Sequence, residues 1–309
     1  MSEPRYPAPD PRDVDPRAVR RGFARAAPTY DDAAALQREI GARMNERLEY
    51  VKLAPAAVLD AGCGTGDAVG ELAARYPAAR VVAFDVALPM VERARARSQV
   101  RRTALSRLLR PFAARGVADA AFVCADIVAL PFAGVAFDLV WSNLALQWVN
   151  DLPRAFAEFR RVLKVGGLLS FTTFGPDTLR ELRSAFAGVD ARTHTNRFVD
   201  MHDIGDMLVH AGFADPVMDM EYVTLTYETP RALLAELKAI GATNRTRGRP
   251  PGLMGRARFV RVLEQLERLR KEGRIPATFE VVYGHAWKGE PRTTPEGHAI
   301  VRLHPRRRE

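Results

Sequence analysis

The sequence has few of the residues that build disulfides or metal sites. Cys63 and Cys124 are the only cysteines among 309 residues; one lies in a glycine-rich turn and the other in an apolar run. We therefore expect buried free thiols rather than a disulfide or a metal pair. The six histidines lack the spacing of paired zinc ligands and have no cysteine near them, so we expect no metal site.

Long hydrophobic runs and an apolar N-terminal segment are also missing. The apolar runs are interrupted well before the length that spans a bilayer. The opening residues, Met-Ser-Glu-Pro-Arg, do not lead into the apolar core of a signal peptide. We therefore expect no transmembrane helix, no membrane partner and a cytoplasmic location.

Acidic residues are absent from one long arginine-rich stretch. Residues 93–115 hold eight arginines and no acid, a local charge of +8 in a chain of net charge +9. Residues 288–309 hold six basic and three acidic residues, so the remainder of the chain is close to neutral. Local basic patches of this kind suit an acidic protein partner or nucleic acid, or they are solvated faces with no specific partner.

Among the features that are present, residues 57–67 (AVLDAGCGTGD) are the most informative. An apolar run ends in Asp60 and crosses Gly62, Gly64 and Gly66 before a helical pattern begins, which predicts a strand, a tight turn and a helix. The glycines allow a ligand close to the main chain, and the helix start offers free N–H groups. The spacing is not the G-x-G-x-x-G that cradles a pyrophosphate, and the acid favours a zwitterionic or cationic ligand. The pattern is similar to motif I of the class I S-adenosylmethionine (SAM) methyltransferases.

Strand and helix patterns alternate along most of the chain. We expect strands at residues 57–60, 80–85, 121–126, 137–142, 168–174, 218–227 and 278–287, and helices at 67–75, 90–97, 152–163, 176–187, 203–211, 230–240 and 256–271. This alternation predicts an α/β fold with a mostly parallel, doubly wound sheet. The resemblance of the glycine turn to motif I implies that this is the class I methyltransferase (Rossmann-like) fold, and we expect seven strands, N-terminal helices and a helical lid insertion. Ligands on such sheets bind outside the carboxyl ends of the strands.

The domain organisation follows from these patterns. Residues 1–50 are expected to comprise a disordered segment (1–16) and two covering helices, the second at 31–50; residues 51–288 form the SAM-dependent methyltransferase domain with a lid-like insertion at about 228–275; and residues 289–309 form a basic tail. The arginine-rich part of residues 95–120 is expected to be an inserted or extended helix with its arginines facing outward.

Acids stand at the ends of two further predicted strands. Asp85 follows the glycine turn by about 20 residues, the spacing expected of an acid that accepts from both hydroxyls of a ribose. It could equally be a helix-capping acid. Asp126, followed by the apolar Ile127, could accept from the amine of adenine while Ile127 packs on the ring, or be an ordinary turn residue. Together with the glycine turn, these acids favour SAM as the cofactor. The expected cofactor-binding residues are Asp60, Gly62, Cys63, Gly64, Gly66, Asp85, Val86, Met90, Asp126, Ile127, Ser142 and Asn143.

The segment after the fourth strand, residues 142–148 (SNLALQW), is expected to lie under the reacting methyl group. Amino-methyltransferases of DNA and RNA commonly have Asn/Asp-Pro-Pro-Tyr/Phe at this place, and this segment contains no proline. The basic stretches also lack the interleaved aromatic residues of a stacking platform. We therefore expect no nucleic-acid partner.

Several segments resemble one family more specifically. They are residues 23–30 (FARAAPTY), 59–64 (LDAGCG), 141–148 (WSNLALQW), 171–173 (FTT), 196–198 (NRF) and 237–244 (LKAIGATN). In this order they resemble the BioC family, the malonyl-acyl carrier protein O-methyltransferases of biotin synthesis, over roughly residues 18–287. The long arginine-rich insertion, the N-terminal extension and the basic tail depart from that family's pattern.

The resemblance implies methylation of the free carboxylate of a malonyl thioester, carried by acyl carrier protein or coenzyme A. Such a carboxylate has a pKa of about 4 and needs no general base, so catalysis would consist of positioning. Arg197 is the candidate cation for the carboxylate, although a surface ion pair is an equally good interpretation. Tyr30, Asn143, Gln147 and Lys238 are the further candidates for substrate positioning. The Arg93–Arg115 stretch could dock the acidic carrier protein.

Two other interpretations remain open at this point. Residues 174–179 (FGPDTL), 203–205 (DIG) and 275–279 (IPATF) are similar to the methyltransferase-like assembly factor of mitochondrial complex I, a family associated with hydroxylation of a protein arginine. A SAM-binding module without turnover is the other alternative.

Overall fold

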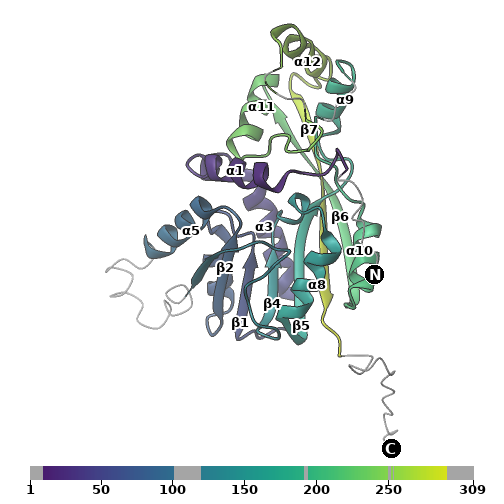
Figure 1. The fold of residues 1–309 in the computed structure, drawn as a ribbon. Helices are drawn as coiled ribbons and strands as arrows, with labels where there is room; N and C mark the ends of the chain where they lie inside the picture. Colours follow the sequence, from purple (N-terminus) through teal and green to yellow (C-terminus); the bar gives the residue numbers. More distant parts are fainter. Residues whose placement is uncertain (1–9, 101–119, 191–193, 250–251, 253, 291–309) are drawn as a thin grey trace, which may run out of the picture.

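The computed structural model describes residues 10–100, 120–190, 194–249, 252 and 254–290 (Figure 1). In this part of the chain one seven-stranded sheet has the order β3-β2-β1-β4-β5-β7-β6. The strands are β1 (Ala57–Ala61), β2 (Arg80–Asp85), β3 (Ala121–Cys124), β4 (Phe137–Ser142), β5 (Leu163–Phe174), β6 (Ala214–Tyr227) and β7 (Ile275–Trp287).

The helices of the described chain flank the sheet and extend beyond one end of it (Figure 1). They are α1 (Pro16–Ala26), α2 (Tyr30–Ala33), α3 (Ala35–Arg47), α4 (Asp67–Arg75), α5 (Leu88–Val100), α8 (Leu152–Val162), α9 (Arg180–Ala187), α10 (Met201–His210), α11 (Pro230–Ala239) and α12 (Arg256–Arg268), with 3-10 turns η1 (Leu48–Tyr50) and η2 (Leu146–Trp148).

The strand directions confirm the predicted mostly parallel sheet. Strands β3, β2, β1, β4 and β5 pair in parallel, and β7 runs antiparallel between β5 and β6. The chain leaves β1 toward β2 and β3 on one side and later returns to β4 and β5 on the other. The strand order therefore reverses beside β1, which is the place where ligands bind in open sheets of this kind.

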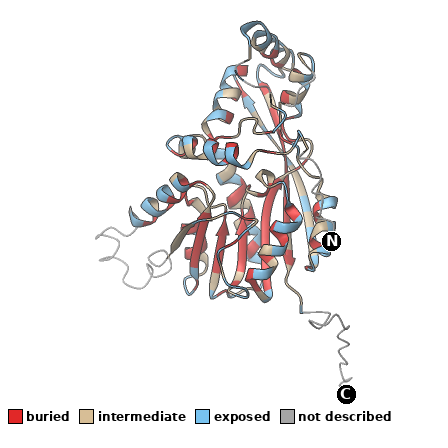
Figure 2. Ribbon diagram, in the orientation of Figure 1, coloured by how far each residue is buried: buried red, intermediate tan, exposed pale blue. Residues whose placement is uncertain are grey.

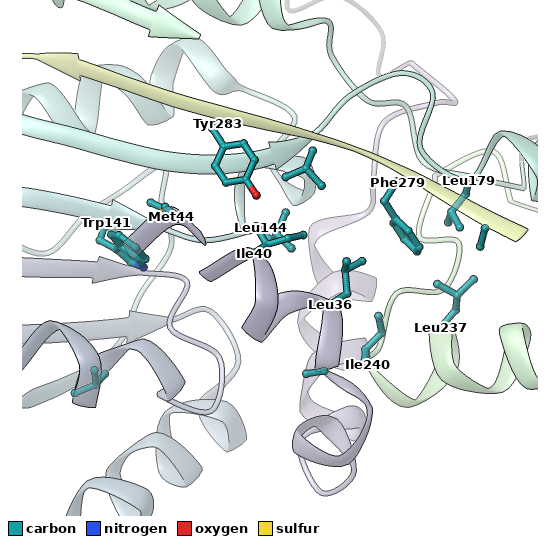
Figure 3. Close-up of a cluster of buried hydrophobic side chains, with 14 of the residues drawn as sticks. Leu36, Ile40, Met44, Trp141, Leu144, Leu179, Leu237, Ile240, Phe279 and Tyr283 are labelled. Carbon is teal, nitrogen blue, oxygen red and sulfur yellow. The ribbon is translucent and has the colours of Figure 1, made fainter. Parts of the chain in front are cut away.

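The central strands of the sheet are buried on both faces, whereas the edge strands β3 and β6 are partly exposed (Figure 2). One face packs on α8 and α10 through residues such as Phe156, Phe159 and Leu208. The other packs on α3 and α4, where Leu36, Ile40 and Met44 recur at four-residue steps. Figure 3 shows this α3 stripe between Trp141 of β4 on one side and Leu237 of α11, Ile240 and Phe279 of β7 on the other. Each buried Leu or Ile contributes roughly 1.5–3 kcal/mol to the stability of the fold. Helix α3 therefore joins the sheet firmly to the helices that lie beyond it, α9, α11 and α12, which we term the outlying helices.

Several boundaries differ from the sequence-based ones. The helix expected at residues 31–50 is interrupted at Ala34 (φ −86°, ψ 38°), which separates α2 from α3, and its last turn is the 3-10 turn η1. Strand β5 begins at Leu163, five residues early, because its pairing with β4 shifts register between Phe137 and Leu139. The insertion predicted as a lid holds α11 and α12, which lie beyond the sheet with α9 (Figure 1).

The chain ends and the arginine-rich insertion lie partly outside the described residues. Nothing is described for residues 1–9, 101–119 and 291–309, where the predicted insertion and basic tail largely fall. The disorder expected up to residue 16 is wrong for residues 10–15: Val14 is buried, forms a bridge with Thr246, and exchanges two hydrogen bonds of 2.9 Å with the Asn150 side chain.

The cysteine prediction is confirmed only in part. Both cysteines are free, and Cys63 is half-buried in the glycine turn. Cys124 is exposed, contrary to the expectation of a buried thiol, because β3 is an edge strand of the sheet. No helix in the described part of the chain is long and apolar enough to cross a membrane.

Candidate functional site

The glycine turn after β1 has the geometry that its sequence predicts. Gly62, Gly64 and Gly66 have φ values of 80°, 52° and 80°, a region that side chains with a Cβ rarely adopt. A Cβ on Gly62 would overlap the Ala145 methyl group, and one on Gly66 would lie 2.7 Å from that of Ala94. Gly62 and Gly66 are therefore restricted to glycine by both backbone conformation and space, and Gly64 by backbone conformation alone.

Asp60 presents a buried carboxylate without a full set of partners. It is 2% exposed, and its Oδ2 atom has no hydrogen-bond partner in the described chain. Burial, together with the charges of Asp85 and Asp67, raises the pKa of Asp60 to about 8. A cationic group on a ligand would supply the missing partner and favour the ionised form.

Asp85 links the turn to the next helix. Its Oδ2 accepts from the Gly64 N–H (3.1 Å) and its Oδ1 from the Ala87 N–H (2.8 Å). Burial raises the pKa of Asp85 to about 6, against the lowering effect of these hydrogen bonds. The Ala87 N–H precedes the first residue of α5, Leu88, so Asp85 holds the turn before the helix and does not cap the helix itself. The same carboxylate also lines a cavity.

This cavity, which we term the glycine-turn cavity, has a volume of about 230 Å³. The residues of the predicted cofactor set that line it are Gly62, Gly64, Asp85, Val86, Met90, Asp126, Ile127 and Asn143. A smaller space of about 60 Å³, the side cavity, is lined by Asp60, Cys63, Gly62, Gly64 and Asn143 together with residues of α2 and α3. Ten of the twelve predicted cofactor residues thus line one of two neighbouring cavities.

A third space, the aromatic cavity, lies between the sheet and the outlying helices. It has a volume of about 220 Å³. Its aromatic lining residues are Phe23, Tyr30, Trp148, Phe174, Phe186, His194, Phe198 and Phe279, and its neutral polar ones include Gln37, Gln147, Asn196, Thr243 and Asn244. Among its described lining residues there is no Asp, Glu, Lys or Arg.

Tyr30 is the residue at which the spaces meet. It lines all three cavities, and Phe23, Leu144 and Trp148 are shared by the glycine-turn and aromatic cavities. Burial and the nearby Asp85 raise the pKa of the Tyr30 phenol well above its usual range, so this group is a neutral hydrogen-bond donor. A group in the aromatic cavity could therefore meet a ligand in the glycine-turn cavity beside Tyr30.

The segment after β4 shapes this junction. Leu144 has a φ of 50°, a strained conformation that costs on the order of 1–3 kcal/mol. Its N–H donates to the Oγ1 (3.0 Å) and the carbonyl oxygen (3.2 Å) of Thr172. The Asn143 amide donates to the Gln37 carbonyl oxygen (2.9 Å) and accepts from Thr172 (2.7 Å). Asn143 thereby fixes α3 to β4 and β5 next to the cavities.

Some predicted residues do not reach the cavities. Ser142 is fully buried and donates to the Ala61 carbonyl oxygen (2.9 Å), which joins β4 to β1. Gly66 packs against Ala94 of α5. Arg197 is exposed, and after Arg12 it helps to hold the pKa of Asp10 near 2. Lys238 is exposed on α11. The structure thus brings Tyr30, Asn143 and Gln147 to the junction but neither predicted cation.

Other lining residues were not predicted from the sequence. Gln37 lines the aromatic and side cavities, and its buried Oε1 has no partner in the described chain. Asn196 is 8% exposed and accepts from the Arg245 N–H (3.4 Å). The sequence signal was present in part, since Asn196 and Asn244 fall within the segments that carry the family resemblance. Phe23 also falls within one of these segments, residues 23–30, but it was not predicted as a lining residue.

Comparison with known proteins gives these cavities a context. Residues 59–171 match the family model for a methyltransferase domain. The chain is 56% identical to a malonyl-acyl carrier protein O-methyltransferase of Gallionella capsiferriformans, over 94% of this chain and 96% of the relative. An enzyme of the same name from Laribacter hongkongensis is 53% identical, over 94% of this chain and 97% of the relative. Another from Nitrosospira multiformis is also 53% identical, over 92% of this chain and 93% of the relative.

Solved structures agree on the fold. The YcgJ protein of Bacillus subtilis superposes with a TM-score of 0.57 at 17% identity, over 82% of this chain and 100% of that chain. Phosphoethanolamine N-methyltransferase 2 of Haemonchus contortus, in complex with SAM, superposes with a TM-score of 0.52 at 17% identity, over 85% of this chain and 57% of that chain. The architecture is that of a class I SAM-dependent methyltransferase.

Proposed function

The chain belongs to the malonyl-acyl carrier protein O-methyltransferase family, and from this membership we propose that it methylates the free carboxylate of a malonyl thioester on acyl carrier protein. The observation that carries the proposal is more than 50% identity to three such enzymes over nearly the whole of both chains. The product would be a malonyl thioester methyl ester, formed in the synthesis of the pimeloyl part of biotin.

The residues at the turn fit SAM. The unpartnered Oδ2 of Asp60 would accept from the ammonium group of its methionine part, while Gly62 and Gly64 would allow that part close to the backbone. Asp85 would accept from the ribose hydroxyls, and Asp126 with Ile127 would hold the adenine. When bound, SAM supplies a methyl group on a positively charged sulfur.

The aromatic cavity suits a carboxylate acceptor because its described lining contains no Asp, Glu, Lys or Arg. A malonyl carboxylate is ionised at neutral pH, with a pKa of about 4, and needs no base to become a nucleophile. A cation beside the carboxylate would stabilise its negative charge before the reaction and so make it a weaker nucleophile. The described lining offers neutral donors instead, and apolar walls that exclude water. Because the reaction joins an anion to a cation and removes both charges, exclusion of water favours it.

Neutral groups at the junction would orient the carboxylate. We assign this role to the Tyr30 hydroxyl and to the free N–H of the Gln147 amide. Gln37 is not assigned as a donor, because the unpartnered atom of its amide is Oε1, which can only accept a hydrogen bond. Asn143 would act by holding α3 and Thr172 in place. Arg197 and Lys238 remain candidates for contacts at the protein surface.

The carrier protein is the partner that the family implies, and the Arg93–Arg115 stretch is our first docking hypothesis. Arg93 and Arg95 are exposed on α5 and would be accessible to a partner. Arg97 is engaged by Asp31 (2.6 Å) and Asp67 (2.5 Å), so it is not available to a partner. The remaining arginines of the stretch lie outside the described residues.

The other sequence-based interpretations are not supported by the relatives. Family membership favours carboxyl methylation over the assembly-factor alternative and over a binding module without turnover. A cytoplasmic location remains a prediction from the sequence.

The test is methyl transfer by the purified protein. SAM labelled in the methyl group is incubated with malonyl-carrier protein or with acetyl-carrier protein, which lacks the free carboxylate. We expect label in a base-labile ester on the malonyl substrate and none on the acetyl substrate. Absence of label on malonyl-carrier protein, from protein that binds SAM, would contradict the proposal.

A further inference from the structure

Helix α1 presents an arginine face without acidic partners. Arg17, Arg20, Arg21 and Arg25 are all exposed, and the helix contains no acidic residue. The opposite side of α1 is buried through residues such as Val19 and Ala26. None of the four arginines forms an ion pair within the described part of the chain, whereas arginines elsewhere, such as Arg43 and Arg161, do.

A second group of arginines reaches the same place from the loop after α11. The guanidinium group of Arg245 lies against Gly22, so closely that a Cβ there would overlap it. The Nε atom of Arg245 is buried and has no hydrogen-bond partner in the described chain. Arg249 lies beside Asp15 at 3.6 Å, the one ion pair that the described chain gives this group.

Four of these arginines, Arg21, Arg25, Arg245 and Arg249, lie close enough to interact electrostatically. Burial lowers the pKa of Arg245, and the positive charges of Arg25, Arg249 and Arg21 lower it further. Repulsion of this kind is unfavourable for the isolated protein and would be relieved by an anionic partner. We refer to Arg17, Arg20, Arg21, Arg25, Arg245 and Arg249 as the arginine surface.

The arginine surface borders the aromatic cavity. Phe23, between Arg21 and Arg25 in sequence, lines that cavity and stacks edge-on against Trp148 at 5.2 Å. Asn244, the neighbour of Arg245, lines the cavity too, and the Arg245 N–H bonds to the lining residue Asn196. Figure 1 shows α1 lying across the molecule between the sheet and α11. A partner on this surface would therefore sit over the space in which the acceptor group is expected.

We propose that the arginine surface is the docking site for the acidic carrier protein, which would deliver its malonyl group into the aromatic cavity beside Phe23. The inference rests on the proposed function, because the carrier is the partner only if the substrate is a carrier-bound thioester. It differs from the Arg93–Arg115 hypothesis in its site. Helix α1 also packs on α5, so the two basic regions adjoin and must be separated by experiment.

The test compares three double charge-reversal variants that all change the net charge of the protein by the same amount. The variant Arg21→Glu/Arg25→Glu alters the arginine surface, and Arg258→Glu/Arg261→Glu is the matched control, on two exposed residues of α12 without ion pairs in the described chain. A third variant, Arg101→Glu/Arg102→Glu, tests the other basic stretch. Each is assayed with malonyl-carrier protein, malonyl-coenzyme A and malonyl-pantetheine after thermal unfolding has shown that it is folded.

We expect the KM for malonyl-carrier protein to rise about tenfold or more in Arg21→Glu/Arg25→Glu, with loss of its dependence on salt. The kinetics with malonyl-pantetheine, and those of the α12 control with the carrier substrate, should be unchanged. An unchanged KM, or one raised only by Arg101→Glu/Arg102→Glu, would overturn the inference. An equal rise with malonyl-coenzyme A would also overturn it, since the surface would then bind phosphate and not the carrier. A wild-type protein inactive with every malonyl thioester would instead refute the proposed function.

Discussion

At the scale of single residues, Tyr30 has the central position because it lines all three cavities. We expect Tyr30→Phe to lower kcat/KM for the malonyl substrate by roughly 10- to 100-fold, since a hydrogen bond to a charged group contributes about 1.5–3 kcal/mol. The phenyl ring preserves the packing, so the unfolding temperature should change little. Steady-state kinetics and thermal unfolding measure the two effects.

Tyr222→Phe is the control for that prediction. Tyr222 is 51% exposed on β6, and its hydroxyl donates to Asp177 (3.0 Å) away from the junction. The control variant should keep wild-type kinetics. Equal activity of both variants would remove Tyr30 from the mechanism.

Asp60 should make SAM binding depend on pH. In the free protein its pKa is raised to about 8, so the carboxyl is largely protonated at pH 6, whereas the ammonium group of SAM favours the ionised form. SAM affinity should therefore increase from about pH 6 to about pH 7.5, by up to about tenfold per unit. Calorimetry should detect release of a proton on binding.

Asp60→Asn should bind SAM more weakly and lose most of this pH dependence. The exposed Asp203→Asn on α10 should behave as the wild type. A pH dependence that survives in Asp60→Asn would assign the titration to another group, with Asp85 as the next candidate.

At the scale of elements, the strand, turn and helix around Gly62 form the site's most constrained unit. Gly62→Ala combines a φ of 80° with overlap on Ala145. The backbone strain alone costs about 1–2 kcal/mol. We expect a lower unfolding temperature and a loss of SAM affinity of at least about tenfold, measured by thermal unfolding and calorimetry.

Gly273→Ala is the control for Gly62→Ala, because it introduces backbone strain without steric overlap. Gly273 has a φ of 78°, and a Cβ there would meet nothing within 4 Å. This variant should lose stability through strain alone and retain SAM affinity. If Gly62→Ala bound SAM as tightly as Gly273→Ala does, the proposal that SAM approaches the backbone closely at Gly62 would be contradicted.

The same element shows what the sequence can predict. Asp60, the three glycines and Asp85 were predicted because each role depends on a local pattern, and local patterns determine strand ends and positive-φ turns. The seven strands follow from the same alternation. The break at Ala34 and the register shift in β5 were not predicted, because they depend on how elements pack.

The lining of the aromatic cavity was only partly predictable for the same reason. It is assembled from α1, α3, the segment after β4, residues near 194–198 and the end of α11. Asn196 and Arg197 are adjacent in sequence, yet one is buried at the cavity and the other is exposed. Which of two neighbours faces a cavity is decided by tertiary packing, so the sequence favoured the cation, whereas the neutral residue lines the space.

At the scale of the whole molecule, the arginine surface is separate from the aromatic cavity in which the carboxylate is expected to react. The described lining of the aromatic cavity holds no charged Asp, Glu, Lys or Arg, while arginines gather on the outer face of α1. Such an arrangement suits a substrate whose carrier is recognised by charge outside and whose carboxylate reacts in a neutral space. Without a general base, kcat at saturating SAM should be flat between about pH 7 and 9. A rise through a single pKa in this range would indicate a base.

The most direct measurement of the central claim is a competition for labelled SAM between equal amounts of malonyl- and succinyl-carrier protein, because the ratio of labelled esters gives the ratio of kcat/KM. The neutral donors beside Tyr30 should hold the shorter acid in reach of the methyl group, and one misplaced methylene costs about 1–3 kcal/mol. We predict at least about tenfold more methyl ester on malonyl-carrier protein. Equal labelling of the two substrates, or a preference for succinyl-carrier protein, would contradict the assignment of this cavity to a malonyl carboxylate.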